Sequence, residues 1–191
     1  MALPENYMTP EAYLKFERSS EIKHEYYGGE VFAMTGASRQ HNLIVGNCAA
    51  TLHTQLRKTP CEVFLCNMRV KIGSNALYIY PDISVVCGEP EFEDDFVDTL
   101  LNPTVIIEVL SPSTELYDRG RKFQHYRTLT SLQEYVLIAQ DSYRVEHFIR
   151  QPNDEWLLSD AVTLDATIQL PSIQCQLALS DVYEKVTFEE A

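Results

Sequence analysis

Apolar and polar side chains alternate along this chain in patterns that predict helices separated by groups of strands. The clearest helix covers residues 38–58, where apolar side chains recur at helical spacing and Pro60 follows the last turn. Its apolar positions are Leu43, Cys48, Leu52 and Leu56. A shorter helix is expected over residues 10–18, because Thr9 can cap it and Pro10 suits its first position.

A third helix is expected after Ser113 and Thr114, whose hydroxyl groups can cap its amino end. Its predicted apolar face consists of Leu116, Phe123 and Tyr126. Runs rich in branched and aromatic residues predict strands over residues 61–72, 77–87, 104–110, 134–139, 143–149 and 156–158. Gly28 and Gly29 predict a hairpin within residues 24–35. This order predicts an α/β (α+β) fold in which helices flank a central mixed sheet, as a single domain over residues 1–191.

Composition and charge argue against some classes of function. The 191 residues include 28 acidic and 15 basic side chains, so the net charge is −13. Such a chain is not expected to bind nucleic acid through a broad basic surface, although a small basic site remains compatible with it. No membrane span or leader is expected, which favours the cytoplasm. The five cysteines, which show no CxxC pair, are expected to be free thiols.

Two carboxylates in apolar strands are the clearest sign of chemistry. Asp82 follows Pro81, and Glu108 stands 26 residues later within Val-Ile-Ile-Glu-Val-Leu. A charge in a buried strand is costly unless it is paired or binds a metal, and hard oxygen ligands suit Mg²⁺ or Mn²⁺. The alternative is structural: Asp82 would cap a turn, and Glu108 would lie on a half-exposed strand face.

The amino-acid sequence around these acids resembles that of a nuclease family. PDISVV, IIEVLSPST and DRGRKFQHY are similar to the Uma2 family (DUF820), within the PD-(D/E)xK restriction-endonuclease-like superfamily. The resemblance implies a restriction-endonuclease-like core and a metal-dependent endonuclease, with DNA as the expected nucleic acid and a homodimer as a plausible assembly. It implies that Asp82, Glu108 and the backbone carbonyl of Val109 hold Mg²⁺ or Mn²⁺.

The chain departs from the superfamily pattern at one position. The pattern places lysine two residues after the second acid, where this chain has Leu110. The resemblance offers Lys122, on the following helix, as the substitute that orients the attacking water and offsets negative charge. Alternatively, Lys122 is a solvated helix residue that pairs with Asp118 at i−4.

Further residues enter through the same resemblance. Glu25 corresponds to an acid that the family carries before its first hairpin, and it could bind the cation through water or serve a second metal. His41 could contact phosphate or transfer a proton. Arg119 and Arg121 are candidate phosphate contacts, although such basic helix faces are often simply solvated.

The second hypothesis is a catalytically inactive nuclease fold that serves as an interaction module, which the missing local lysine and the acidic composition favour. A serine hydrolase is disfavoured because Ser111 and Ser113 lack nucleophile-elbow glycines. Nucleotide cofactors are not expected, since neither GxGxxG nor GxxxxGK[ST] occurs.

Overall fold

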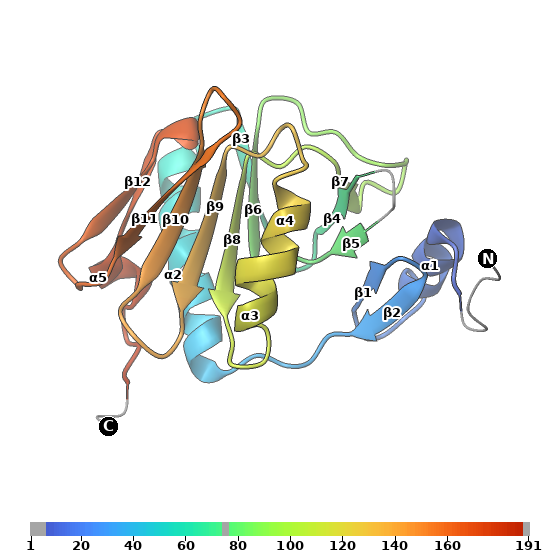
Figure 1. Ribbon diagram of the computed structural model, residues 1–191, viewed down its shortest axis with the longest axis horizontal. Coiled ribbons are helices and arrows are strands. Elements are labelled where there is room, and N and C mark those ends of the chain that lie inside the picture. The colour runs from blue at the N-terminus through green and yellow to red at the C-terminus, as the bar shows by residue number, and fades with distance from the viewer. Residues whose placement is uncertain (1–6, 74–76, 189–191) are drawn as a thin grey trace.

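The computed structural model describes residues 7–73 and 77–188, which form a mixed α/β fold with two main sheets (Figure 1). β8 and β9 of the larger, six-stranded sheet run parallel, and its other neighbouring strands run antiparallel. The predicted central mixed sheet is therefore present. In spatial order its strands are β11 (Trp156–Ala161), β10 (Val145–Arg150), β9 (Glu134–Ala139), β8 (Val105–Leu110), β6 (Ile83–Cys87) and β3 (Cys61–Leu65).

A second, five-stranded sheet lies beside the larger one, on the right in Figure 1. Its spatial order is β2 (Glu30–Ala33), β1 (His24–Tyr27), β5 (Leu77–Ile79), β4 (Arg69–Ile72) and β7 (Thr99–Leu100). The predicted hairpin joins β1 to β2 through Gly28 and Gly29, both at positive φ, a conformation that costs glycine little. The predicted first helix, α1 (Pro10–Glu17), is capped by Thr9 and packs Tyr13 against Tyr26 and Tyr78.

Helices cover both faces of the six-stranded sheet. On one face, α2 (Arg39–Leu56) packs through Ile44, Cys48, Leu52 and Leu56, so Ile44 takes the buried position predicted for Leu43. The opposite face carries the helix that follows β8, together with β4 and β5 of the smaller sheet. Because β8 is covered on both sides, all six of its residues are buried, and its apolar run is interrupted by Glu108 alone.

Two predicted strands are each divided in the structure. Residues 61–72 form β3 and β4, separated by a turn in which the Met68 amide donates to the Leu65 carbonyl. Residues 77–87 form β5 and β6, which belong to different sheets. Pro81, at this second break, has no amide hydrogen to continue a ladder. Asp82 consequently lies where the chain passes from the small sheet to the large one.

The helix after β8 is more irregular than its sequence indicates. It consists of α3 (Glu115–Tyr117), a π-helical turn (Asp118–Lys122) and α4 (Phe123–Tyr126). The wider turn changes the face presented to the sheet, so Leu116 is 89% exposed and the prediction that it joins the apolar face is wrong. The same turn buries Asp118 and Lys122. Turns of this kind occur frequently at functional sites.

The chain between residues 167 and 182 forms elements that the sequence analysis did not predict. These are β12 (Thr167–Leu170), a 3₁₀ turn (Pro171–Ile173), β13 (Cys175–Ala178) and α5 (Leu179–Val182). Ile168, Leu170 and Leu177 pack into the core beneath α2. Gln55 of α2 both donates to and accepts from the backbone of Gln176, which fixes the hairpin against the helix.

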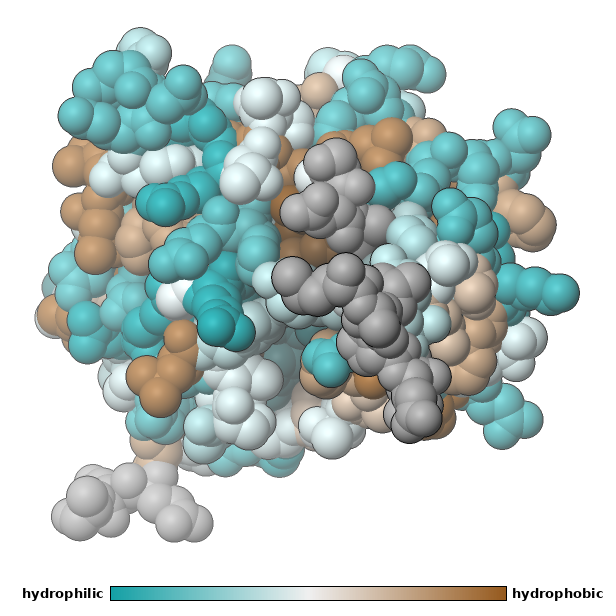
Figure 2. Space-filling model, turned by 45° about the vertical axis from the view of Figure 1, so that its right-hand side comes forward, coloured by the Kyte–Doolittle hydropathy of each residue, from teal (hydrophilic) through white to brown (hydrophobic). Residues whose placement is uncertain are grey.

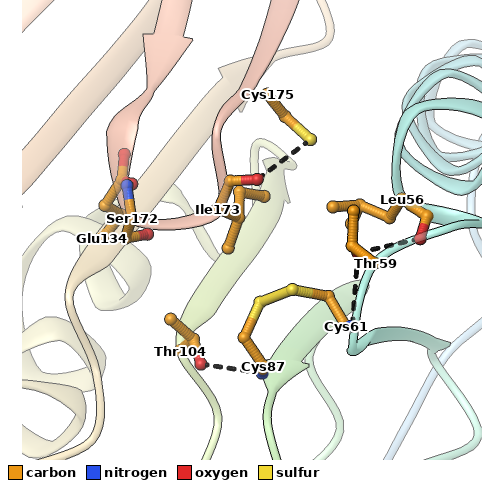
Figure 3. The surroundings of a disulfide bond; sticks show 9 residues. All are labelled: Leu56, Thr59, Cys61, Cys87, Thr104, Glu134, Ser172, Ile173 and Cys175. Carbon is orange, nitrogen blue, oxygen red and sulfur yellow. Dashed lines mark hydrogen bonds between the residues drawn. A yellow bond between two sulfur atoms is a disulfide. The ribbon is translucent and has the colours of Figure 1, made fainter.

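The expectation that all cysteines are free is wrong for two of them. Cys61 and Cys87 form a disulfide between β3 and β6 (Figure 3). The antiparallel register sets these two residues directly opposite each other, which brings their side chains within bonding reach. Cys48 and Cys175 are free and buried, and Cys66 is free and half-buried.

The surface is largely hydrophilic on the face shown in Figure 2, with small hydrophobic areas between charged side chains. Among the helices within residues 7–73 and 77–188, none is both long enough and apolar enough to cross a membrane.

Candidate active site

Strand register brings the two predicted acids together. β6 and β8 are antiparallel, and Ile83 pairs with Ile107. Continuing this register by one residue sets Asp82 opposite Glu108, on the face that carries the π-helical turn. Side chains opposite each other in an antiparallel pair have Cβ atoms roughly 4.5–5.5 Å apart. The structure therefore places the two carboxylates as cross-strand neighbours.

Glu108 occupies a buried, strongly polar position. Its Oε1 accepts a hydrogen bond of 2.7 Å from the Tyr126 hydroxyl and lies 2.8 Å from the Lys122 Nζ. With 4% of its surface exposed, Glu108 does not lie on a half-exposed strand face, so that structural alternative is wrong. Burial raises the pKa of Glu108 to about 8, the Lys122 ammonium opposes this rise, and Asp82 adds to it.

Lys122 points from the helix toward the acids of the sheet. Its ammonium lies between Glu108 and Asp118, the latter at 3.2 Å, so the lysine makes both the predicted i−4 pair and a contact with the second acid. Burial lowers the pKa of Lys122, but the carboxylates of Glu108, Glu25 and Asp118 together raise it well above the ordinary value. The amine is therefore a fixed positive charge at neutral pH.

Asp82 lies nearer the surface, beside the first turn of α2. Its Oδ2 accepts a 2.8 Å hydrogen bond from the Val109 amide and lies 3.2 Å from the His41 Nε2. The Ser38 hydroxyl accepts from the His41 amide and thereby caps α2 and fixes the start of the helix. His41 thus lies at the edge of the carboxylate group.

Glu25 reaches the same region from β1 of the smaller sheet. Its Oε1 accepts a long, 3.4 Å hydrogen bond from the Tyr80 amide. Burial raises the pKa of Glu25, Lys122 opposes the rise, and Asp118 and Asp82 contribute to it. These mutual effects show that Glu25 faces the same group of charges. We use the term acidic site for Glu25, Asp82, Glu108 and Asp118 around Lys122.

The two predicted phosphate contacts differ in their surroundings. Arg119 is held by Glu146 of β10, through a 2.9 Å hydrogen bond from Nε, and it also pairs with Glu115. Its donors are therefore directed to protein carboxylates. Arg121 is exposed and close enough to His125 to lower the pKa of that histidine, after the larger effect of burial.

Two members of the site had no predicted chemical role. Asp118 is 2% exposed and shares the Lys122 ammonium, and Tyr126 donates to Glu108 from a fully buried position. Both fall on the helix after β8 at four-residue spacing from Lys122. The sequence signal was this spacing, since Asp118, Lys122 and Tyr126 lie one turn apart.

The carboxylates of the acidic site are oxygen ligands of the kind that a hard divalent cation prefers. Within the described residues, no group of three or more His, Cys, Asp or Glu side chains has the geometry of a metal site. Mg²⁺ commonly takes only one or two carboxylates and completes its shell with water and substrate oxygens. Asp82 and Glu108 can supply such a pair. Four carboxyl groups surround one ammonium, and the pKa values of Glu25 and Glu108, which burial raises first, are raised further by the neighbouring carboxylates. These residues fit a hard divalent cation.

Comparison with known proteins gives a consistent result. The model of a family named Uma2, described as "Putative restriction endonuclease", matches residues 10–180. An uncharacterised protein of Synechocystis, sll1609, is 37% identical over 162 residues, or 85% of this chain and 92% of that protein. A second uncharacterised Synechocystis protein, slr1290, is 31% identical over 181 residues, or 95% of this chain and 94% of that protein.

A solved structure shares the fold. It is described as "a putative nuclease belonging to DUF820 from Anabaena variabilis", and it superimposes with a TM-score of 0.76 at 21% sequence identity. The match covers 94% of this chain and 99% of the other. At this level of identity the likeness concerns the arrangement of helices and strands.

Proposed function

Because this chain belongs to the Uma2 family, we propose that it is a metal-dependent endonuclease that hydrolyses phosphodiester bonds of nucleic acid, with DNA as the first substrate to test. The observation that carries the proposal is the position of Lys122. Its Nζ lies 2.8 Å from Glu108, although the lysine comes from the following helix and not from position 110. A lysine thus reaches the second acid by another route.

In the proposed site, Asp82, Glu108 and the Val109 carbonyl would hold Mg²⁺ or Mn²⁺, and Glu25 would bind the cation through water or serve a second one. When bound, such a cation polarises the scissile phosphate and lowers the pKa of a coordinated water. Its charge would also relieve the repulsion among the carboxylates.

The chain's own residues supply the remaining functions. Lys122 stays protonated, so it can orient the attacking water by donating a hydrogen bond and can offset the charge that develops on the phosphate oxygens. Tyr126 positions Glu108 through a hydrogen bond, and Asp118 positions Lys122 through an ion pair. His41, beside Asp82, is suited to contact phosphate or to accept a proton at Nε2. Arg121 is available to contact a flanking phosphate.

The test is cleavage by the purified full-length protein. Single-stranded and double-stranded DNA and RNA, including structured RNA, are incubated with Mg²⁺, with Mn²⁺ or with EDTA. We expect cleavage in either metal and none in EDTA. Asp82→Asn and Lys122→Ala should each lower the rate by at least about 100-fold, in line with the loss of one charge-stabilising group. Lys185→Ala, which changes an exposed lysine, is the matched control and should retain the rate.

Circular dichroism of each variant separates loss of chemistry from loss of folding. Calorimetric titration with Mn²⁺ provides a second readout that does not depend on turnover, and Asp82→Asn should weaken that binding. If none of the substrates is cleaved while the protein is folded and binds metal, the endonuclease proposal is wrong for these substrates. The interaction module would then be the better account.

A further inference from the structure

A cleft of about 730 Å³ opens beside the acidic site, between the β1–β2 hairpin and the end of α4. Aromatic and apolar side chains form much of its wall. Among the residues that line it are Tyr7, Tyr27, Ile72, Leu77, His125 and Thr128. We call this feature the aromatic cleft.

Two rings face each other at the cleft. The Tyr27 and His125 ring centroids are 5.3 Å apart, with the planes inclined by 55°. Tyr27 is 43% exposed, so its ring is accessible at the surface. Burial, followed by the charge of Arg121, lowers the pKa of His125, so its ring is neutral at pH 7. A neutral imidazole and a phenol ring can each stack on a flat aromatic group.

The glycine turn contributes to the shape of the wall. Gly29 has φ +100°, and a Cβ atom at this position would collide with the ring of Tyr7. Glycine therefore allows Tyr7 to pack directly over the hairpin, at the side of the cleft. Met8 strengthens this arrangement because its amide donates to the Gly29 carbonyl and its carbonyl accepts from the Tyr26 hydroxyl.

Two elements that carry residues of the acidic site also contribute residues to the cleft. Glu25 and Tyr27 are two residues apart on β1, so their side chains leave the same side of the strand about 7 Å apart. Lys122 and His125 are three residues apart on the helix and share one face. On β1 and on the helix, a charged residue of the acidic site is thus followed along the chain by an aromatic residue that lines the cleft. A chain that places a phosphate near Lys122 would place its neighbouring base near Tyr27.

We infer that the aromatic cleft binds an unstacked base of single-stranded nucleic acid, next to the phosphate that is hydrolysed. This inference rests on the proposed function for the role of the phosphate. Stacking on aromatic side chains is sequence-tolerant, and Arg121 and Lys122 on the adjoining helix can contact the backbone of the same strand. Short-range contacts of this kind are compatible with a net charge of −13. The apolar side chains of Ile72 and Leu77 would cover the base edge, and the Thr128 hydroxyl, which donates to the His125 carbonyl, can accept a hydrogen bond at the rim. Bases paired within a duplex are not available for such contacts.

The experiment measures binding without cleavage. The full-length protein in EDTA is titrated into fluorescently labelled oligothymidylate, an abasic strand of equal length and a duplex, and anisotropy gives the Kd of each. Tyr27→Ala should weaken binding of oligothymidylate by at least tenfold, equivalent to about 1.4 kcal/mol. Tyr27→Phe retains the ring and should stay within about twofold of the wild type. Tyr143→Ala removes a similarly exposed tyrosine, in the loop between β9 and β10, and serves as the matched control.

The outcomes distinguish the cleft from the catalytic proposal. Tighter binding of oligothymidylate than of the abasic strand or duplex, lost in Tyr27→Ala and kept in Tyr27→Phe, supports the inference even if no substrate is cleaved. Equal binding of the base-containing and abasic strands, an unchanged Kd in Tyr27→Ala, or no binding of single strands overturns it, even if the enzyme cleaves. A repeat with oligouridylate shows whether the base is taken from DNA or RNA.

Discussion

The ion pair between Lys122 and Glu108 allows a quantitative test of the site's electrostatics. The atoms are 2.8 Å apart and both side chains are less than a tenth exposed. With an effective dielectric constant of 20, the Coulomb attraction at this distance is about 6 kcal/mol. Removing two charges from water costs several kcal/mol for each ion, so the pair as a whole contributes little net stability.

Substituting one partner of the pair is expected to lower the free energy of unfolding far more than substituting both partners together. Lys122→Met leaves Glu108 and Asp118 without their cation, and Glu108→Gln leaves the ammonium with one direct ion-pair partner, Asp118. Each substitution should lower the free energy of unfolding by about 3–5 kcal/mol. The double variant should recover at least about 2 kcal/mol of the summed loss, because neither partner then remains as an uncompensated buried charge.

The assay is urea unfolding followed by circular dichroism in EDTA at pH 9, where Glu108 with its pKa of about 8 is ionised, for the wild type, both single variants and the double variant. The pair between Arg144 and Asp160 provides the control, since its atoms are 3.5 Å apart and both side chains are about half exposed. The corresponding cycle should give a coupling energy below about 1 kcal/mol. Additive losses at Lys122 and Glu108, within about 0.5 kcal/mol, would refute the description of the two residues as an electrostatic unit.

Two further predictions concern stability away from the acidic site. Hydrogen bonds from Arg18, and further ones from Arg69, hold the pKa of Asp98 well below its usual range. Asp98→Asn should therefore cost about 1–2 kcal/mol at pH 7, and the difference from the wild type should shrink steadily as the pH falls below about 4, where the unfolded chain takes up the proton before the folded protein does. A difference that stays constant in acid melting curves would contradict this. The disulfide closes 26 residues of sequence separation, so replacing Cys61 and Cys87 together by serine should lower stability by about 3.5 kcal/mol. Wild type with reductant should match this variant in the same unfolding assay, and equal midpoints with and without reductant would disprove a contribution from the bond.

Much of the framework was predictable because its signals are local. The cap and proline at the start of α1 and the paired glycines of the first hairpin each depend on a few adjacent residues. The same is true of the apolar run that forms β8. An acid within such a run is conspicuous, so Glu108 could be selected from the sequence alone.

The missed features depend on contacts between distant segments. Arg119 is held by Glu146, 27 residues away, and no local pattern announces that pairing. The disulfide exists because β3 and β6 are antiparallel neighbours, a fact of topology. The hairpin after residue 166 is short, and its alternation of Ile168 and Leu170 becomes meaningful only when α2 is available as a packing partner.

The π-helical turn accounts for the difference between the helix predicted after β8 and the helix observed there. A regular helix after β8 would have accommodated Leu116 on its apolar face, as its spacing indicates, but the wider turn exposes Leu116 and buries Asp118 with Lys122. The buried lysine then lies against Glu108, where the chain has leucine at position 110. The irregular backbone thus brings a lysine close to the second acid in space, although the sequence lacks a lysine at position 110. Because the net charge of −13 opposes long-range attraction of polyanions, we expect affinity for nucleic acid to depend on short-range contacts at this turn and at the aromatic cleft beside it.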